Sequence, residues 1–335
     1  MKKFLTVILS LILCFGTTFA VSCNQPVEQG KVNVKYYADG QKIVQSIMGG
    51  SETIGLVPEP AASNLEKNYQ TKKGQSLYRL DLQELYDSQE KAYPQAVLMV
   101  KKSVLGAHTG IVETLQDKIT QSASWVKTNV AAAVNAINEK GGTTLSAGAL
   151  SEKAIDGCKI YWQSAENAKT SVKNYINRIV EIDNEKATAV SDDFFYTTAQ
   201  TAAPKDNYTF MVPDGAPSLA IAKLINDKDD LGTGANLSYS VIQSTQVNNN
   251  LSDGAVDFMV APVNLASKLY KANKADNYVM VAVLTHGNFY IMSTTEISVS
   301  DLVGKQIAVP NMGAVPDWTF KMVLEKNNIN YATVE

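Results

Sequence analysis

A strand–turn–helix corner occurs twice in this sequence, about two hundred residues apart. Gly50–Leu65 reads GSETIGLVPEPAASNL, and Gly254–Leu269 reads GAVDFMVAPVNLASKL. Aligned without a gap, both have a glycine, an apolar run, a proline and then Ala-Ser-x-Leu. The apolar run predicts a buried strand, and proline is tolerated in the first turn of a following helix. The repeat therefore predicts two α/β units with one such corner each; two similar turns of one large sheet are the alternative.

Predicted strands and helices alternate in two blocks. Lys31–Tyr37 alternates apolar and polar residues as a strand does, and an amphipathic helix ending at Gly-Gly follows it. Gln95–Leu105 is a further strand, Ile111–Glu185 is mostly helical, and the alternation resumes at Tyr208. Strands that alternate with helices favour parallel pairing. A length of 335 residues fits about two domains.

Composition and motifs exclude several functions. The chain has 30 Lys and Arg against 33 Asp and Glu, a net charge of −3, so it carries no basic surface for nucleic acid. With 45% hydrophobic and 19% charged residues it is an ordinary globular sequence. It has two histidines and no H-E-x-x-H, G-x-S-x-G, P-loop or C-x-x-C motif. We expect no enzyme activity, no cofactor and no metal site.

The first 22 residues have the pattern of a secretory signal peptide: a Met-Lys-Lys start, an apolar run and small residues before Cys23. A cysteine directly after a small residue is typical of bacterial lipoproteins, so we expect Cys23 to be lipidated and residues 23–30 to form a tether. The protein would then be anchored to the outer face of the bacterial cytoplasmic membrane. Plain secretion, with cleavage near Ala20 and a free Cys23, is the alternative. Cys158 is left without a disulfide partner.

Four segments together resemble the type II solute-binding proteins of bacterial ABC importers: residues 36–63, 208–225, 254–270 and 301–329. The most similar members of that family bind sulfonates, taurine, nitrate or thiamine-precursor pyrimidines. The resemblance implies a two-lobed α/β fold in which each lobe is a mainly parallel sheet flanked by helices. It also implies a monomer that captures a small polar or anionic solute by hinge closure and delivers it to a permease and its ATPase. A sensor ectodomain, or a surface ligand-binding lipoprotein without a transport role, is the alternative.

The order of these segments differs from that family. Relatives begin with a segment like Tyr208–Glu335 and continue with one like Lys31–Tyr196, so the chain is expected to be circularly permuted. Glu335 would run on into Gln29 as a helix–loop–strand connection, and Thr197–Asn207 would join the usual termini. Permutation is tolerated where termini lie at the surface. The expected division is residues 31–100 plus 290–335 for lobe 2, 101–190 plus 208–289 for lobe 1, and 191–207 for a linker, with the two crossings near Val100 and Tyr290.

Ligands of open α/β sheets lie beyond the carboxyl ends of strands, where helix N-termini offer free N–H groups. Corners of this kind give the predicted ligand-binding residues Asp39, Gly40, Glu59, Gly215, Ala216, Ser218, Asn264, His286, Gly287, Asn288, Asn311, Gly313 and Ala314. Ser218 could serve only as a helix cap, and His286 could be purely structural. If Glu59 contacts the ligand, a cationic or heteroaromatic N–H group becomes more favourable than a sulfonate.

Overall fold

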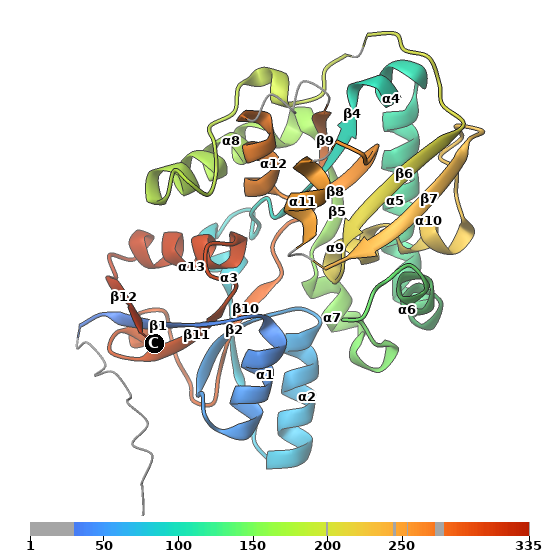
Figure 1. Cartoon of the computed structure of the whole chain (residues 1–335). Helices are drawn as coiled ribbons and strands as arrows, with labels where there is room; N and C mark the ends of the chain where they lie inside the picture. The colour runs from blue at the N-terminus through green and yellow to red at the C-terminus, as the bar shows by residue number, and fades with distance from the viewer. Residues whose placement is uncertain (1–29, 199, 244–245, 253, 272–277, 335) are drawn as a thin grey trace, which may run out of the picture.

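The computed structural model describes residues 30–198, 200–243, 246–252, 254–271 and 278–334. They form two lobes, each built on a six-stranded sheet (Figure 1). Lobe 2 lies at the bottom of Figure 1 and joins strands from both ends of the described chain, whereas lobe 1 is built from its middle. The predicted α/β fold with two lobes is confirmed, and the alternative of one large sheet is wrong.

The sheet of lobe 2 has the strand order β12–β1–β11–β2–β10–β3. Its strands are β1 (Val32–Tyr37), β2 (Ile54–Pro58), β3 (Tyr78–Asp81), β10 (Phe289–Ser293), β11 (Gln306–Pro310) and β12 (Tyr331–Val334). The sheet of lobe 1 has the order β5–β9–β4–β8–β6–β7. Its strands are β4 (Ala96–Lys101), β5 (Ile160–Ser164), β6 (Asn207–Pro213), β7 (Asn236–Ile242), β8 (Phe258–Pro262) and β9 (Tyr278–Thr285). Each sheet therefore contains one copy of the repeated corner, after β2 and after β8.

Helices cover both faces of the two sheets (Figure 1). They are α1 (Gly40–Gly49), α2 (Ala61–Lys73), α3 (Leu82–Tyr86), α4 (Lys102–Ala107), α5 (Ile111–Thr128), α6 (Val130–Glu139), α7 (Glu152–Gly157), α8 (Ala165–Ile182), α9 (Ala216–Ala220), α10 (Ala222–Asp227), α11 (Val247–Ser252), α12 (Val263–Lys271) and α13 (Val315–Lys326). Short 3-10 turns span Ala147–Ala149, Asp192–Phe194 and Ser300–Leu302. The predicted stop of the first helix is present, because Gly50 adopts φ 80° and its N–H donates to Ile47.

Four buried apolar clusters fill the faces of the sheets, two in each lobe. In the β4 strand, Leu98 and Val100 belong to one cluster while Val97 and Met99 belong to another, as the alternation of side chains along a strand requires. One of the lobe 1 clusters also contains Trp318 of α13, a helix of lobe 2. The two lobes therefore share part of their apolar core.

The expectation of mainly parallel sheets is correct for lobe 2 and wrong for lobe 1. In lobe 1, β6 pairs in parallel with β7 and β8, but β4 is antiparallel to β8 and β9, and β5 is antiparallel to β9. The reason is the path of the chain. β4 begins directly after a crossing from lobe 2, so it starts at the edge where β8 and β9 end. In lobe 2, β10 begins directly after the return crossing and is antiparallel to β2 for the same reason.

The structure moves the boundary between the lobes. The boundary between lobe 2 and lobe 1 was expected after residue 100, within β4. The whole of β4 instead pairs within the sheet of lobe 1. The chain crosses between the lobes at residues 87–95 and again at residues 286–288. The expected linker, 191–207, is also more than a connection, because Phe195 is buried and forms a β-bridge with Met280.

The two ends of the described chain lie in neighbouring strands, but β12 runs parallel to β1. A loop was expected before the point where Glu335 would continue into Gln29. This expectation is wrong, since residues 331–334 form a strand. Parallel neighbours need a crossover of about a dozen residues. A direct junction of Glu335 to residue 29 would leave only Glu335 and residues 29–31 to return along the strand. The expected signal peptide, Cys23 and the tether up to residue 29 lie outside the described residues, and no described helix is long and apolar enough to span a membrane.

Candidate binding site between the two lobes

The carboxyl ends of β2, β8 and β9 lie at the crossings, where β4 and β10 begin. In lobe 2, Pro58 at the end of β2 pairs with Phe289, the residue that follows the crossing 286–288. In lobe 1, Ala96 at the start of β4 pairs with Pro262 and with Thr285, the last residues of β8 and β9. The two repeated corners therefore lie at the facing edges of the two lobes, where a ligand of an α/β sheet is expected.

The predicted residues at the start of α1 have structural roles. Asp39 is the N-cap, and its carboxylate accepts a hydrogen bond of 2.9 Å from the backbone N–H of Lys42. Gly40 allows close approach to the end of β2, because a Cβ atom there would lie 2.6 Å from Cδ of Pro58. Both residues lie at the facing edge, and a ligand contact of either one stays a prediction.

The predicted residues before α13 form a tight turn at the edge of lobe 2. Asn311 has φ 54°, its N–H donates to the carbonyl of Tyr37, and its own carbonyl accepts from Ala314 N–H. The Gly313 N–H donates to a carboxylate oxygen of Asp317 at 2.9 Å. The free N–H groups expected at this helix start are therefore partly used within the turn.

At the edge of lobe 1, the structure separates the predicted residues into satisfied and unsatisfied ones. The Ser218 hydroxyl donates to the carbonyl of Gly215 at 2.8 Å, so it serves the first turn of α9, which begins at Ala216. The Asn264 amide nitrogen donates to the carbonyl of Lys186 at 3.3 Å, but its Oδ1 is buried without a partner.

The crossing 286–288 is held by its own three residues. Gly287 has φ 82°, and a Cβ atom there would lie 2.6 Å from side-chain atoms of Gln83 and Tyr93. Asn288 is 4% exposed; its amide nitrogen donates to the Glu59 carbonyl at 3.1 Å, and its Oδ1 accepts from Gln95 at 3.0 Å. These contacts make the crossing a defined pivot between the lobes.

His286 is buried at the beginning of the same crossing. Its ring stacks on the ring of Tyr161 with 3.6 Å between centroids, and its Nε2–H donates to the Tyr161 carbonyl at 3.2 Å. Burial lowers the pKa of His286 from 6.5 to about 4, because desolvation disfavours the charged form. The imidazole is therefore neutral at pH 7.

Acidification from pH 7 to pH 5 is expected to destabilise the protein by about 2 kcal/mol through His286 alone. Its folded-state pKa is depressed, so the stability that it contributes is complete above pH 6.5 and is lost as the pH falls toward 4. Urea unfolding of the wild type and of His286→Gln at both pH values measures this term. Equal losses of stability in the two proteins would contradict it.

A charged cluster that sequence reasoning found only in part lies at the β2–α2 corner. Glu59 Oε1 is 2.7 Å from Nη2 of Arg79, and the two side chains are 0% and 15% exposed. Ser63 donates two further hydrogen bonds to the Glu59 carboxylate, from its hydroxyl to Oε1 at 2.7 Å and from its backbone N–H to Oε2 at 3.0 Å. Burial alone lowers the pKa of Arg79, and the Glu59 carboxylate reverses this, so the net shift is upward. Both oxygens of Glu59 are thus already bonded within lobe 2.

The cluster also reaches lobe 1. The guanidinium carbon of Arg79 lies 3.4 Å from the centre of the Tyr290 ring, and the Tyr290 hydroxyl donates to the Gly157 carbonyl at 3.2 Å. Lys153 of α7 forms an ion pair of 2.5 Å with Glu66 of α2. α7 and α2 therefore form one flank of the interface between the lobes.

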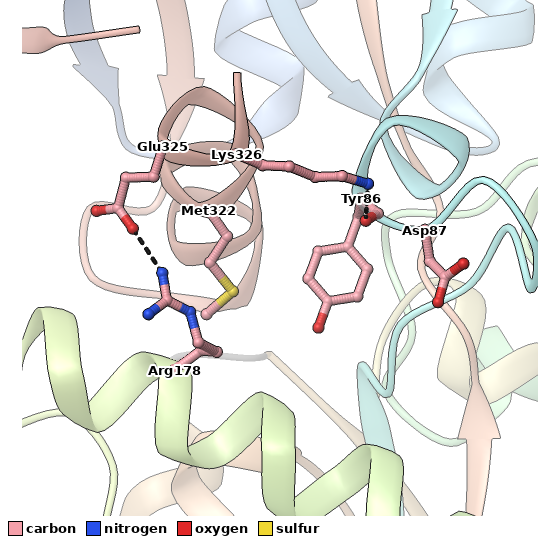
Figure 2. Close-up of a pocket in the computed structure, with 6 residues that line it drawn as sticks. All are labelled: Tyr86, Asp87, Arg178, Met322, Glu325 and Lys326. Carbon is pink, nitrogen blue, oxygen red and sulfur yellow. Dashed lines mark hydrogen bonds and ion pairs between the residues drawn. The ribbon is translucent and has the colours of Figure 1, made fainter. Parts of the chain in front are cut away.

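The other flank is closed by α8 and α13, which lie side by side (Figure 1). The Tyr175 hydroxyl is 2.6 Å from that of Thr319, and Arg178 forms an ion pair of 2.8 Å with Glu325. Figure 2 shows this ion pair at one side of a hollow of about 410 Å³. The hollow is lined by Tyr86, Asp87, Arg178, Met322, Glu325 and Lys326. It opens on the side of the molecule where the crossing 87–95 begins.

Buried polar atoms without a hydrogen-bond partner gather at the facing edges. They belong to the side chains of Tyr93, Gln95, Trp162, Asp214, Asn264, Thr285 and Trp318. Three of these residues, Gln95, Thr285 and Asn264, are close neighbours. The Gln95 N–H donates to the Thr285 carbonyl, and the N–H of Val263, the residue before Asn264, donates to the Gln95 carbonyl, each at 3.0 Å. An unsatisfied buried group costs about 1–3 kcal/mol. Such groups are rare in folded proteins, and each one requires an explanation.

Sequence reasoning missed Gln95, Thr285 and Arg79. A signal was present for two of them, because Gln95 and Thr285 are the polar residues that border the buried runs of β4 and β9 on the side of the crossings. Within the described ranges, no three His, Cys, Asp or Glu side chains are grouped so that they could hold a metal ion.

Sequence comparisons give no relative. No protein-family model matches the sequence, and no protein of curated function matches it. Solved structures resemble it weakly. The oligopeptide-binding protein AppA from Bacillus subtilis, in complex with a nonapeptide, has 10% identity and a TM-score of 0.33 over 76% of this chain and 54% of AppA. NikA from Staphylococcus aureus, in complex with Ni(L-His)2, has 8% identity and a TM-score of 0.34 over 81% of this chain and 59% of NikA.

A third such structure is NikA from Brucella suis in complex with Fe(III)-EDTA, with 8% identity, a TM-score of 0.31 and coverage of 80% of this chain and 58% of NikA. The chain thus spans between half and three fifths of the length of these proteins. Similarity at this level carries no argument about the function of the chain, which has to come from its own lobes and edges.

Proposed function

We propose that this protein is the substrate-binding lipoprotein of an ABC-type importer. It captures a small polar solute between its lobes by hinge closure, and the closed form delivers the solute to a membrane permease driven by an ATPase. Cys23 carries the lipid anchor that holds the monomer at the outer face of the bacterial cytoplasmic membrane. The observation that carries the proposal is the pair of six-stranded sheets between which the described chain passes only twice, at residues 87–95 and at residues 286–288.

The contacts across the two flanks support a hinge that can open. The ion pairs Lys153–Glu66 and Arg178–Glu325 have partly exposed side chains, and such pairs contribute about 0–1 kcal/mol each. The crossings themselves are fixed by local hydrogen bonds, such as the one from the Asn288 amide to the Glu59 carbonyl, which lie close to the pivot. Rotation about the crossings would separate the flanks while the pivot stays intact, and it would also break the buried Tyr175–Thr319 contact and expose part of the core around Trp318.

We further infer a type II periplasmic-binding-protein fold in circularly permuted order, on the basis of the resemblance of four segments to that family. In that arrangement Thr197–Asn207 joins the usual termini; within it, the Ala202 N–H donates to the carbonyl of Gly106 in α4 at 3.1 Å. A rearranged gene that begins near Tyr208 tests the inference, provided that about a dozen residues are inserted between Val334 and Val32. A rearranged chain that does not fold would contradict it.

A sensor ectodomain with the same two lobes is the second candidate, and catalysis is no part of either. Gene neighbourhood separates the two candidates: adjacent permease and ATPase genes support import, whereas an adjacent kinase gene supports sensing. Native mass spectrometry of protein purified without refolding identifies a solute that is carried through purification.

Addition of the solute at about one hundred times its Kd is expected to stabilise the folded protein by about 2.7 kcal/mol, because it binds the folded state only. The measurement is thermal unfolding with and without solute, together with tryptophan fluorescence, since Trp318 lies between the lobes. A rise in Tm without any change in Trp318 emission would support binding but contradict hinge closure; the variant Trp318→Phe identifies the source of the signal.

A further inference from the structure

The unsatisfied atoms at the facing edges differ in chemistry, and acceptors dominate. Asn264 and Gln95 each use the amide nitrogen in a hydrogen bond, to the Lys186 carbonyl and to Asn288 Oδ1 respectively. These bonds fix the orientation of the two amides, so the unpaired atom in each is the carbonyl oxygen. A carbonyl oxygen can only accept, so both require a donor from outside the protein.

Asp214 adds a third acceptor one strand away from β8. Its Oδ2 accepts from the N–H groups of Thr143 and Thr144 at 2.7 and 2.8 Å, while its Oδ1 is buried and unpaired. Thr285 and Tyr93 each offer a hydroxyl, which can donate or accept, and Trp162 and Trp318 each offer one indole N–H, which can only donate. The set therefore has more acceptors than donors and carries one negative charge.

Buried positive charge at this edge is already neutralised. Arg79 is paired with Glu59 at 2.7 Å, and Lys321 is paired with Asp317 at 2.9 Å. Lys186 of lobe 1 lies near Gly313 of lobe 2, but its side chain is exposed. An anion enclosed between the lobes would thus face unpaired acceptors without a buried, unpaired cation among the described residues. Such an arrangement is unfavourable for an anion.

We propose that the solute is a neutral or cationic molecule whose N–H or O–H groups donate to Gln95 Oε1 and Asn264 Oδ1. The hydroxyl of Thr285 and the indole N–H of Trp318 complete its hydrogen bonds. This assignment rests on the proposed function, and it narrows the small polar or anionic solute expected from the sequence to an amine, amidine or amide. Sulfonates and nitrate do not fit, because they offer acceptors only.

The experiment uses small molecules below about 1 kDa from a rich growth extract, separated by ion exchange into anionic, neutral and cationic pools. Thermal unfolding of the purified protein is measured with each pool. A rise in Tm with the neutral or the cationic pool is expected. A rise with the anionic pool alone would overturn the assignment and leave the proposed function intact, whereas no rise with any pool would overturn both.

Variants link the response to the named atoms. Thr285→Val removes a buried hydroxyl that has no partner, so the Tm without solute is expected to stay or rise, while the Kd for the responding compound weakens about tenfold. Asn264→Leu is expected to weaken binding by at least the same factor. Ser122→Ala is the control: its buried hydroxyl accepts from the Lys223 N–H at 3.1 Å within lobe 1, so the Tm falls while the Kd is retained. An unchanged Kd in both Thr285→Val and Asn264→Leu would show that the solute binds elsewhere.

Discussion

Replacement of Arg79 by methionine is expected to lower the free energy of unfolding by about 3–5 kcal/mol. The change leaves the fully buried carboxylate of Glu59 without its cation, at an oxygen that was 2.7 Å from the guanidinium. It also removes the ring contact with Tyr290, whose hydroxyl bonds to lobe 1. Urea unfolding at pH 7 measures the loss.

Two further variants show whether the loss belongs to the buried charge. Lys91→Met removes one partner of an ion pair whose side chains are 50% and 51% exposed, so an effect below about 1 kcal/mol is expected. The double variant Arg79→Met with Glu59→Gln should recover part of the stability, because the stranded charge is gone. A double variant less stable than Arg79→Met alone would mean that the pair is not the cause.

Gly287→Ala has the second large expected effect, a destabilisation of about 2–5 kcal/mol. An L-residue at φ 82° is strained, and the added Cβ would meet Gln83 and Tyr93 at 2.6 Å. Because Gly287 lies in one of the two crossings, the side chains that must shift are those that fix the pivot. We expect the variant to bind solute more weakly as well as to unfold more easily, measured by titration and by urea unfolding.

Gly304→Ala is the matched control for the backbone strain. Gly304 has φ 75°, but a Cβ atom there would meet nothing within 4 Å. Its cost should be that of the strained backbone alone, about 1–2 kcal/mol, without any effect on solute affinity. Equal effects of the two substitutions would show that close packing at the crossing is unimportant.

The pattern of the sequence was sufficient for the elements but not for their partners. Periodicity and the repeated corner predict strands at β2 and β8 and the helices after them. Gln95–Leu105 was predicted to be one strand, but the strand ends at Lys101 and α4 begins at Lys102, and β4 was placed in the wrong lobe. A strand that is apolar on both faces, as β4 is, fits either sheet equally well, so nothing in its own residues decides between them.

The candidate site was predictable in its location but not in its chemistry. Strand ends and helix starts led to Asn264 and His286, which do lie at the facing edge. Whether a polar residue there is satisfied depends on partners far away in the chain: Asn264 on Lys186, and Asn288 on Glu59, 229 positions earlier. Glu59 shows the same limit, because its buried cation, Arg79, lies on another strand and has no sequence signature.

The strand order also determines when each lobe can assemble on a growing chain. β1, β2 and β3 do not pair with one another; every described partner of these three strands lies after residue 288. Lobe 1 is a continuous stretch, complete once β9 has emerged. The first 60 or so residues of lobe 2 must therefore wait, with open hydrogen-bonding edges, for the last part of the chain. A chain with this strand order needs protection from aggregation for nearly its whole period of synthesis, and a chain cut short after lobe 1 would leave those edges open permanently.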